Sequence, residues 1–110
     1  MESALSESSW QYVCELDPET VEFPFVVEAG EEEIAIFRVG DSFHAIQRWC
    51  PHKNADLSEG TLLGNMVKCP LHGYIFRFDD GRGINCVGIQ AQAYQVLFDS
   101  GRLKIRSIEK

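Results

Sequence analysis

Four residues with metal-binding side chains stand in two short, similar motifs near the middle of the sequence. The first motif is Cys50-Pro51-His52 and the second is Cys69-Pro70-Leu71-His72, so each supplies one thiolate and one imidazole. Sixteen residues lie between the motifs, which is enough chain to run out and back as a hairpin and bring both to one centre. With only three His in the sequence, two matched pairs argue against coincidence. We therefore expect an inorganic centre bound by Cys50, His52, Cys69 and His72.

Two kinds of metal centre use such a ligand set. A structural zinc site of the Cys₂His₂ type fits the inventory, although zinc sites usually take two Cys from one loop and two His from the other. A [2Fe–2S] cluster of the Rieske type is held by two Cys on one iron and two His on the other. One Cys and one His from each loop suit that cluster, so the pattern favours [2Fe–2S] over zinc.

The residues around the ligands resemble those of Rieske proteins. Residues 50–60 (CPHKNADLSEG) and 67–78 (VKCPLHGYIFRF) are similar to the two cluster-binding loops, and residues from about 10 to 106 are similar in order and length to single-domain Rieske ferredoxins. The resemblance implies two antiparallel β layers with a smaller cluster-binding subdomain, about 46–80, inserted as loops. It also implies which residues hold each iron: the inner iron by Cys50 and Cys69, and the outer iron, near the surface, by His52 and His72.

Residues beside the ligands resemble the low-potential, soluble branch of this family. High-potential Rieske proteins carry an extra Cys in each loop, where this sequence has Ala55 and Leu71. They also carry a Ser and a Tyr whose hydroxyls donate to cluster sulfur, where this sequence has Tyr74 and Phe76. Because such hydrogen bonds raise the reduction potential, we expect a midpoint toward the low end of the Rieske range, about −150 mV.

The resemblance leaves three roles within that branch. One is a one-electron carrier from a flavin-dependent reductase to a terminal oxygenase, and another is the small subunit of an NAD(P)H-dependent nitrite reductase. The third, the Rieske domain of an oxygenase, needs a second iron site with two His and one carboxylate, which His44 alone cannot supply. We therefore expect an electron carrier rather than an enzyme. The alternatives are the nitrite reductase subunit and a redox-sensing or interaction module with a structural metal centre.

Short segments suited to strands must position the ligands. They recur between turn residues, and no convincing amphipathic helix interrupts them, which indicates an antiparallel all-β domain. Gly40-Asp41 and Ser100-Gly101 predict hairpin turns. Residues 49–65 show no obvious strand, and we interpret them as an ordered loop that carries function. The predicted strands are 10–15, 23–28, 33–39, 42–48, 66–69, 74–78, 94–99 and 102–106.

Four residues within the two loops have supporting interpretations. Gly60 and Gly73 are expected in tight turns that let backbone N–H groups approach the cluster. Lys53 and Asn54 lie beside His52, and we assign them to the rim of a docking surface or to an ordinary solvated face.

The remaining His and Cys have structural interpretations. We expect His44 to be structural or exposed, and Cys14 and Cys86 to be inert small apolar residues that form no disulfide. Relatives commonly cover the cluster with a third loop that contains proline, whereas residues 84–89 contain none. The shape of this loop and the position of Cys86 relative to the cluster therefore stay open.

Length and composition limit the organisation of the chain. At 110 residues it is suited to one domain, so we expect a flexible N-terminus over residues 1–9 and a single Rieske domain over 10–110. A net charge of −7 without clustered Lys and Arg excludes nucleic acid as a partner. The sequence has no long apolar run and no secretory signal. We therefore expect no membrane partner, a cytoplasmic location, and a monomer when the protein is isolated.

The charge is uneven along the sequence. Residues 1–33 contain ten acids and no Lys or Arg, whereas residues 46–80 contain four acids and four bases. The acidity therefore belongs to the N-terminal third, and we expect a nearly neutral surface around the ligands with short-range contacts to a partner.

Overall fold

The structure, a computed structural model, describes residues 10–51, 55–71 and 73–108. These ranges form nine strands and one short 3₁₀ helix, η1. No helix among them is long and apolar enough to cross a membrane. The elements are β1 (Gln11–Glu15), β2 (Phe25–Ala29), β3 (Glu32–Val39), β4 (Ser42–Gln47), η1 (Leu57–Glu59), β5 (Thr61–Leu63), β6 (Met66–Lys68), β7 (Ile75–Arg77), β8 (Ala93–Asp99) and β9 (Arg102–Ser107).

Six strands form one antiparallel sheet in the order β1-β9-β8-β4-β3-β2. Both predicted hairpins are confirmed, since β3 pairs with β4 across Gly40-Asp41 and β8 pairs with β9 across Ser100-Gly101. Ser100 and Gly101 have φ angles of 54° and 80°. These left-handed conformations match a two-residue turn to the twist of its flanking strands.

The large sheet curls until its edge strands β1 and β2 meet. The two predicted β layers are therefore two halves of one sheet, packed over a shared core. Ile34 and Ile36 of β3 point into this core together with Ala45 of β4 and Ile105 of β9, and all four are buried. Strand alternation explains the set, because residues two apart share a face.

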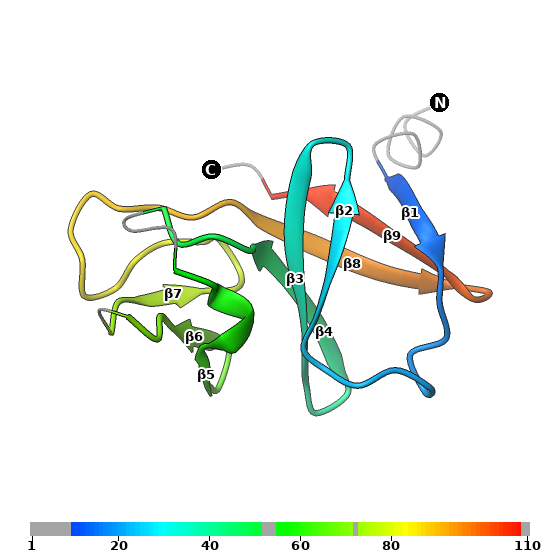
Figure 1. Cartoon of the computed structure of the whole chain (residues 1–110), viewed down its shortest axis with the longest axis horizontal. Coiled ribbons are helices and arrows are strands. Elements are labelled where there is room, and N and C mark those ends of the chain that lie inside the picture. Colours follow the sequence, from blue (N-terminus) through cyan, green and yellow to red (C-terminus); the bar gives the residue numbers. More distant parts are fainter. Residues whose placement is uncertain (1–9, 52–54, 72, 109–110) are drawn as a thin grey trace.

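Strands β5, β6 and β7 form a separate antiparallel sheet, inserted in the chain between β4 and β8 and seen at the left of Figure 1. Its core includes Ala35 and Phe37, which lie on the opposite face of β3 from Ile34 and Ile36. The Phe37 and Phe78 rings pack with their centroids 5.1 Å apart. Strand β3 is thus buried on both faces and joins the two sheets.

All eight predicted strands are present, with ends that differ from the prediction by no more than two residues. The interpretation of residues 49–65 as a stretch without a strand is wrong, because η1 and β5 lie within it. All three residues of β5 are exposed. A strand that buries no side chain produces no alternation of apolar and polar residues, so its sequence carries no period-two signal.

Candidate metal centre

The first Cys/His motif lies in a loop that leaves β4 and closes on itself. The Cys50 N–H donates to the Ala55 carbonyl at 2.7 Å, and the Leu57 N–H donates to the Arg48 carbonyl at 2.7 Å. These bonds join the two ends of the loop and hold the Cys50 backbone at its base. The predicted ligand His52 falls in this loop, and like Lys53 and Asn54 it lies outside the described residues.

The second motif forms a tighter loop between β6 and β7. The Cys69 N–H donates to the Tyr74 carbonyl at 2.6 Å, and the Gly73 N–H donates to the Cys69 carbonyl at 3.0 Å. Gly73 has a φ of 75°, a conformation that a residue with a Cβ adopts only with strain. The tight turn predicted at Gly73 is therefore confirmed, while the adjacent predicted ligand His72 lies outside the described residues.

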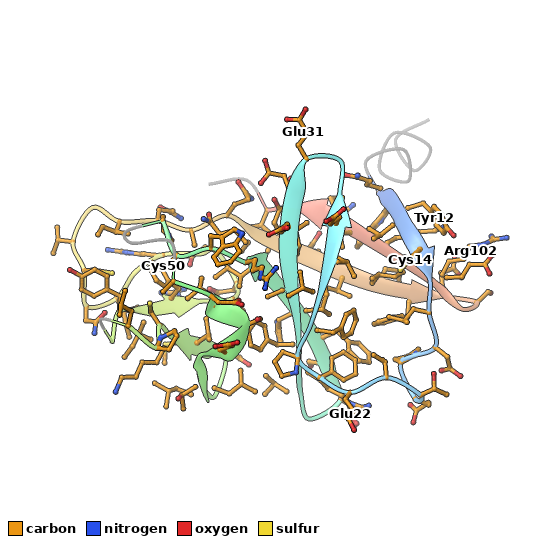
Figure 2. The ribbon with its side chains drawn as sticks, in the orientation of Figure 1. Tyr12, Cys14, Glu22, Glu31, Cys50 and Arg102 are labelled. Carbon is orange, nitrogen blue, oxygen red and sulfur yellow. The ribbon has the colours of Figure 1, made fainter. Side chains whose placement is uncertain are left out.

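The two ligand loops bring their thiols into one apolar core. Cys50, labelled in Figure 2, and Cys69 are each 1% exposed and share this core with Val67 and Phe76. No disulfide involves any of the four Cys. Two buried thiols from separate loops, enclosed by apolar side chains, fit the thiolate-bound iron of a [2Fe–2S] cluster.

The described residues hold only half of the predicted ligand set. Among them, no three His, Cys, Asp or Glu side chains gather into a metal site. The two imidazole ligands of the prediction, His52 and His72, are outside these residues. The structure thus buries both Cys of the predicted centre in one core, and the four-residue ligand set stays a prediction.

Arg48 ties the first ligand loop to the large sheet. Its guanidinium lies 3.4 Å from the Glu33 carboxylate on β3 and 3.0 Å from the Asp56 carboxylate at the far end of the loop. The Trp49 indole N–H donates to the same Glu33 carboxylate at 2.6 Å, and Arg48 stacks over the Trp49 ring at 4.5 Å. Because Cys50 follows directly, these contacts determine where its thiol leaves the sheet.

Asp56 closes the same loop by capping η1. Its carboxylate accepts hydrogen bonds from the Ser58 N–H at 3.0 Å and the Ser58 hydroxyl at 2.6 Å. Burial acts to raise the pKa of Asp56, but hydrogen bonds from Arg48 and Ser58 outweigh it and hold the pKa below its ordinary value. Asp56 is therefore charged at neutral pH and keeps Arg48 paired.

Gly60 ends η1 in a tight turn, as predicted, because its N–H donates to the Leu57 carbonyl at 3.0 Å. Its own backbone is extended, so the turn does not explain why a glycine is required. A Cβ at Gly60 would instead overlap the carbonyl oxygen of Lys68 on β6. The glycine is needed because η1 packs against the strand that leads to Cys69.

A third loop, residues 83–90, covers the core that contains the thiols. Cys86 is buried in that core with Cys50 and Cys69, and burial raises the pKa of its thiol. The Asn85 side chain accepts from the Ile75 N–H at 2.9 Å and donates to the Gly73 carbonyl at 3.0 Å. These hydrogen bonds hold the third loop in place, although it lacks the proline that is common in relatives.

Sequence reasoning did not single out three of these supporting residues. Asn85, Glu33 and Arg48 belong to no motif, and each acts on a residue ten or more positions away in the chain. The one available signal is the apolar run of residues 34–37, which predicts a strand and places Glu33 at its start.

His44 has a structural position, in agreement with its interpretation. Its ring stacks on Phe78 with centroids 5.0 Å apart, and its Nε2 atom is buried without a hydrogen-bond partner. Burial lowers the pKa of His44, an effect that the nearby Asp79 carboxylate partly opposes. His44 is therefore neutral at pH 7 and packs at the junction of the two sheets.

Comparison with known proteins shows the family of the chain. Residues 9–97 match the Rieske [2Fe-2S] domain. The chain belongs to the Rieske [2Fe-2S] domain family. The predicted all-β Rieske fold is thereby confirmed, and a [2Fe–2S] cluster is the cofactor of this family.

Curated relatives of this Rieske chain include two ferredoxins. Ferredoxin CarAc of Metapseudomonas resinovorans is 40% identical over 75 residues, which are 66% of this chain and 68% of that protein. The anthranilate 1,2-dioxygenase ferredoxin subunit of Burkholderia cepacia is 39% identical over 71 residues, 64% of each chain. The similarity thus spans about two thirds of the length of these relatives.

Solved structures extend the likeness over nearly the whole Rieske chain. The ferredoxin of carbazole 1,9a-dioxygenase from Nocardioides aromaticivorans IC177 has a TM-score of 0.76 and 25% identity, covering 87% of this chain and 97% of that one. A complex of reduced oxygenase and oxidised ferredoxin in carbazole 1,9a-dioxygenase contains a chain with a TM-score of 0.70 and 31% identity, covering 93% of this chain and 96% of that one.

Proposed function

We propose that this protein is a one-electron carrier that takes electrons from a flavin-dependent reductase and passes them to a terminal oxygenase. The observation that carries the proposal is the pair of buried thiols, Cys50 and Cys69, brought into one core by two separate loops. Membership of the Rieske family supports it. So do relatives named as ferredoxin components and the solved complex of such a ferredoxin with its oxygenase.

Cys50 and Cys69 would hold one iron of the [2Fe–2S] cluster, and His52 and His72 would hold the other. The bound cluster accepts and releases one electron per chain. All remaining contributions come from the protein, which sets exposure, potential and docking. Imidazole ligands near the surface would shorten the electron path to a docked partner.

The chain keeps the thiol side of the centre dry and fixed. Both thiols are enclosed by apolar side chains, which would exclude water from an iron bound to them. The Arg48 contacts hold the first loop, and the Asn85 hydrogen bonds join the second loop to the third. Loops held at both ends need little rearrangement when the charge of the centre changes, which suits repeated electron transfer.

The remaining parts of the proposal concern the setting. We propose that residues 10–110 act as one Rieske domain, that the isolated protein is a monomer, and that it works in the cytoplasm. The partners of the carrier would be the flavin-dependent reductase and the terminal oxygenase or reductase subunit. Electron transfer to an oxygenase is supported by the solved complex of a similar ferredoxin.

The proposal is tested by following the absorbance of the purified protein without oxygen. A flavin-dependent ferredoxin reductase with NAD(P)H should bleach it, and the oxygenase component of carbazole 1,9a-dioxygenase should then restore it. Cys69→Ala should show neither change, and Cys14→Ala, a substitution outside the centre, should show both. A colourless protein that contains zinc would overturn the proposal. Reoxidation by a nitrite reductase large subunit but not by the oxygenase would support the nitrite reductase alternative instead.

A further inference from the structure

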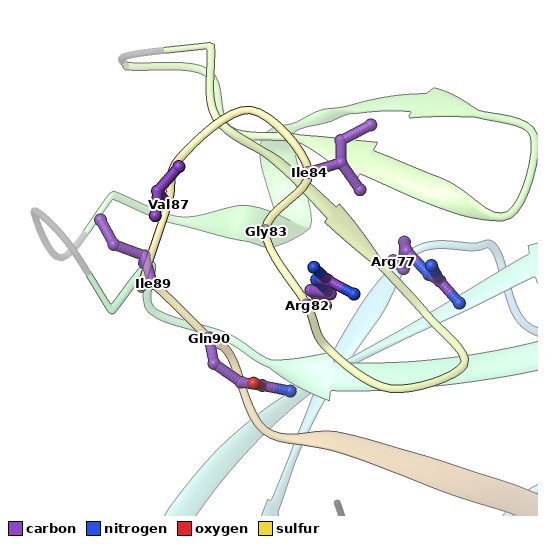
Figure 3. Close-up of a pocket in the computed structure, with 8 residues that line it drawn as sticks. Arg77, Arg82, Gly83, Ile84, Val87, Ile89 and Gln90 are labelled. Carbon is purple, nitrogen blue, oxygen red and sulfur yellow. The ribbon is translucent and has the colours of Figure 1, made fainter.

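A hollow of about 420 Å³ opens beside the third loop, and Figure 3 shows the side chains that line it. Two apolar side chains stand on its rim, with Val87 fully exposed and Ile84 49% exposed. Arg82 and Gln90 supply polar groups to the same rim. We call Arg82, Ile84, Val87 and Gln90 the third-loop surface.

Arg82 is the available positive charge of this surface. The neighbouring Arg77 is already paired, with Asp79 at 3.1 Å and with Asp80 at 3.5 Å. Among the described residues, no acidic side chain pairs with the Arg82 guanidinium. The surface therefore presents one unneutralised guanidinium beside exposed apolar side chains.

The backbone of the third-loop surface is held in place before any partner arrives. The Arg82 N–H donates to the Asp80 carboxylate at 2.9 Å, and the Arg82 carbonyl accepts from the Arg77 N–H at 3.0 Å. The Gln90 side-chain amide donates to the Asp80 carbonyl at 2.7 Å. A surface that is already ordered loses less conformational entropy on binding.

The third-loop surface lies next to the metal centre. Cys86, in the middle of the loop, is buried in the core that contains Cys50 and Cys69. Asn85 donates to the carbonyl of Gly73, the residue that follows the predicted ligand His72. A partner seated on Ile84 and Val87 would thus be close to the second ligand loop, where a short electron path is required.

We propose that the third-loop surface docks a redox partner that presents a carboxylate side chain within an apolar patch. Arg82 would receive the carboxylate, while Ile84 and Val87 would cover the apolar part. This inference rests on the proposed function of electron carrier. Charge complementarity supports it locally, because the Arg82 guanidinium has no acidic partner among the described residues and lies beside the exposed Ile84 and Val87.

The test uses a partner of defined chemistry in place of an unidentified protein. A gold electrode carries a mixed monolayer of carboxylate-terminated and methyl-terminated alkanethiols, and cyclic voltammetry at low ionic strength measures the electron-transfer rate of the intact protein. We expect a reversible one-electron couple for the wild type, despite its net charge of −7. Arg82→Glu should lower the rate about tenfold, and Val87→Ser should lower it by a smaller factor. Arg82→Lys should restore most of the rate.

Arg102→Glu is the matched control, since it changes the charge equally at an exposed residue far from Cys50 (Figure 2). It should leave the rate on the carboxylate surface unchanged. An equal fall in Arg102→Glu and Arg82→Glu would overturn the docking proposal, because only net charge would matter. So would a fall in Lys53→Glu with none in Arg82→Glu. If none of these substitutions changes the electron-transfer rate, the docking proposal is contradicted but the carrier function is not. If the protein gives no reversible couple on any monolayer, the proposed carrier function is contradicted as well.

Discussion

The large and small sheets bury different kinds of side chain. The core of the six-stranded sheet consists of aliphatic and aromatic residues such as Ile34, Ile36 and Ile105. The core beside the three-stranded sheet contains Cys50, Cys69 and Cys86 among its Phe and Val residues. The first core is complete without a ligand, because apolar burial alone stabilises it. We expect the second to depend on the metal centre, since a short sheet of three-residue strands has little apolar area of its own.

The surfaces of the two regions differ in the same way. Six of the eight large apolar side chains that are exposed on the described residues lie between residues 49 and 87. The acidic side chains instead gather on the β2–β3 hairpin, where Glu28, Glu31, Glu32 and Glu33 share one hollow. The acidic side chains thus lie on the large sheet, while most of the exposed apolar side chains lie on the inserted part, which we propose holds the metal centre and contacts the partners.

Among the predicted effects, removal of a thiol ligand should separate the stability of the two sheets the most. Cys69→Ala is expected to abolish the visible absorbance of the cluster, because one iron loses half of its protein thiolates. Since metal binding and folding are coupled, amide hydrogen exchange should become fast in β5, β6 and β7 and stay slow in β3 and β8. Cys14→Ala serves as the control and should keep both the absorbance and the slow exchange. Equal loss of protection in both sheets would show that they fold as one unit.

Removal of the Arg48 anchor should have the next largest effect. Arg48→Met leaves Glu33 and Asp56 without their shared partner, and we expect the cluster to be lost from the protein about tenfold faster, as for other residues that support ligands. The absorbance decay in the presence of a chelator measures this rate. Arg38→Met, which removes the exposed contact with Asp41 at 3.9 Å, is the control and should not change it.

The Arg48 effect should also depend on pH. The pKa of Asp56 is lower in the folded protein than its ordinary value, so its contribution is complete above the unfolded pKa of about 4. It is lost as pH falls through the lower folded pKa. The difference in the rate of cluster loss between wild type and Arg48→Met should therefore be constant near neutral pH and shrink below about pH 4. A difference that shrinks well above that range would exclude Asp56 as the partner that matters.

The potential of the centre should change to a moderate degree. Phe76 is fully buried in the core with both thiols, and Rieske proteins of high potential have Tyr at this position. Phe76→Tyr should raise the midpoint by about 60 mV, which for one electron corresponds to a hydrogen bond of about 1.4 kcal/mol. Phe98→Tyr, in the large sheet, should not shift it. A wild-type midpoint above about +100 mV would contradict the low-potential assignment.

The smallest predicted effect involves the junction of the two sheets. His44 is neutral when folded because burial lowers its pKa, against the influence of Asp79. Its contribution to stability is complete above the unfolded pKa of about 6.5 and is lost as pH falls toward the folded value. The unfolding free energy from urea titrations should therefore fall as pH drops below about 6.5, and less so in His44→Gln. Identical pH dependence in the two proteins would refute this role.

The sequence predicts most of the fold because the large sheet follows simple periodic rules. The β-branched and apolar residues of β3 are visible in the sequence, and the hairpin turns contain the glycines that their conformations require. The matched motifs likewise single out Cys50 and Cys69, which the structure buries in one core, since metal ligands must be of particular types at particular spacings. Each of these features depends on the residues of one short segment, so it can be predicted from that segment alone.

Some features of the site cannot be read from the sequence, and each of them involves a contact between residues that are distant in the chain. The Glu33 contact with Arg48 joins residues 15 apart, and Asn85 reaches back 12 residues to Gly73. A glycine is required at position 60 because β6 lies so close to it, and no pattern in the neighbouring sequence indicates this contact. These positions become interpretable only after the two loops have been placed against one another.

Electron paramagnetic resonance of the reduced protein tests the central claim most directly, because the mean g value reports the ligands of the iron. We predict a mean g value below that of the free electron in the wild type, as expected for imidazole ligands on one iron. We also predict that His72→Cys abolishes this spectrum while Cys14→Ala preserves it. A spectrum that is unchanged in His72→Cys would contradict the assignment of Cys50, His52, Cys69 and His72 as the four ligands.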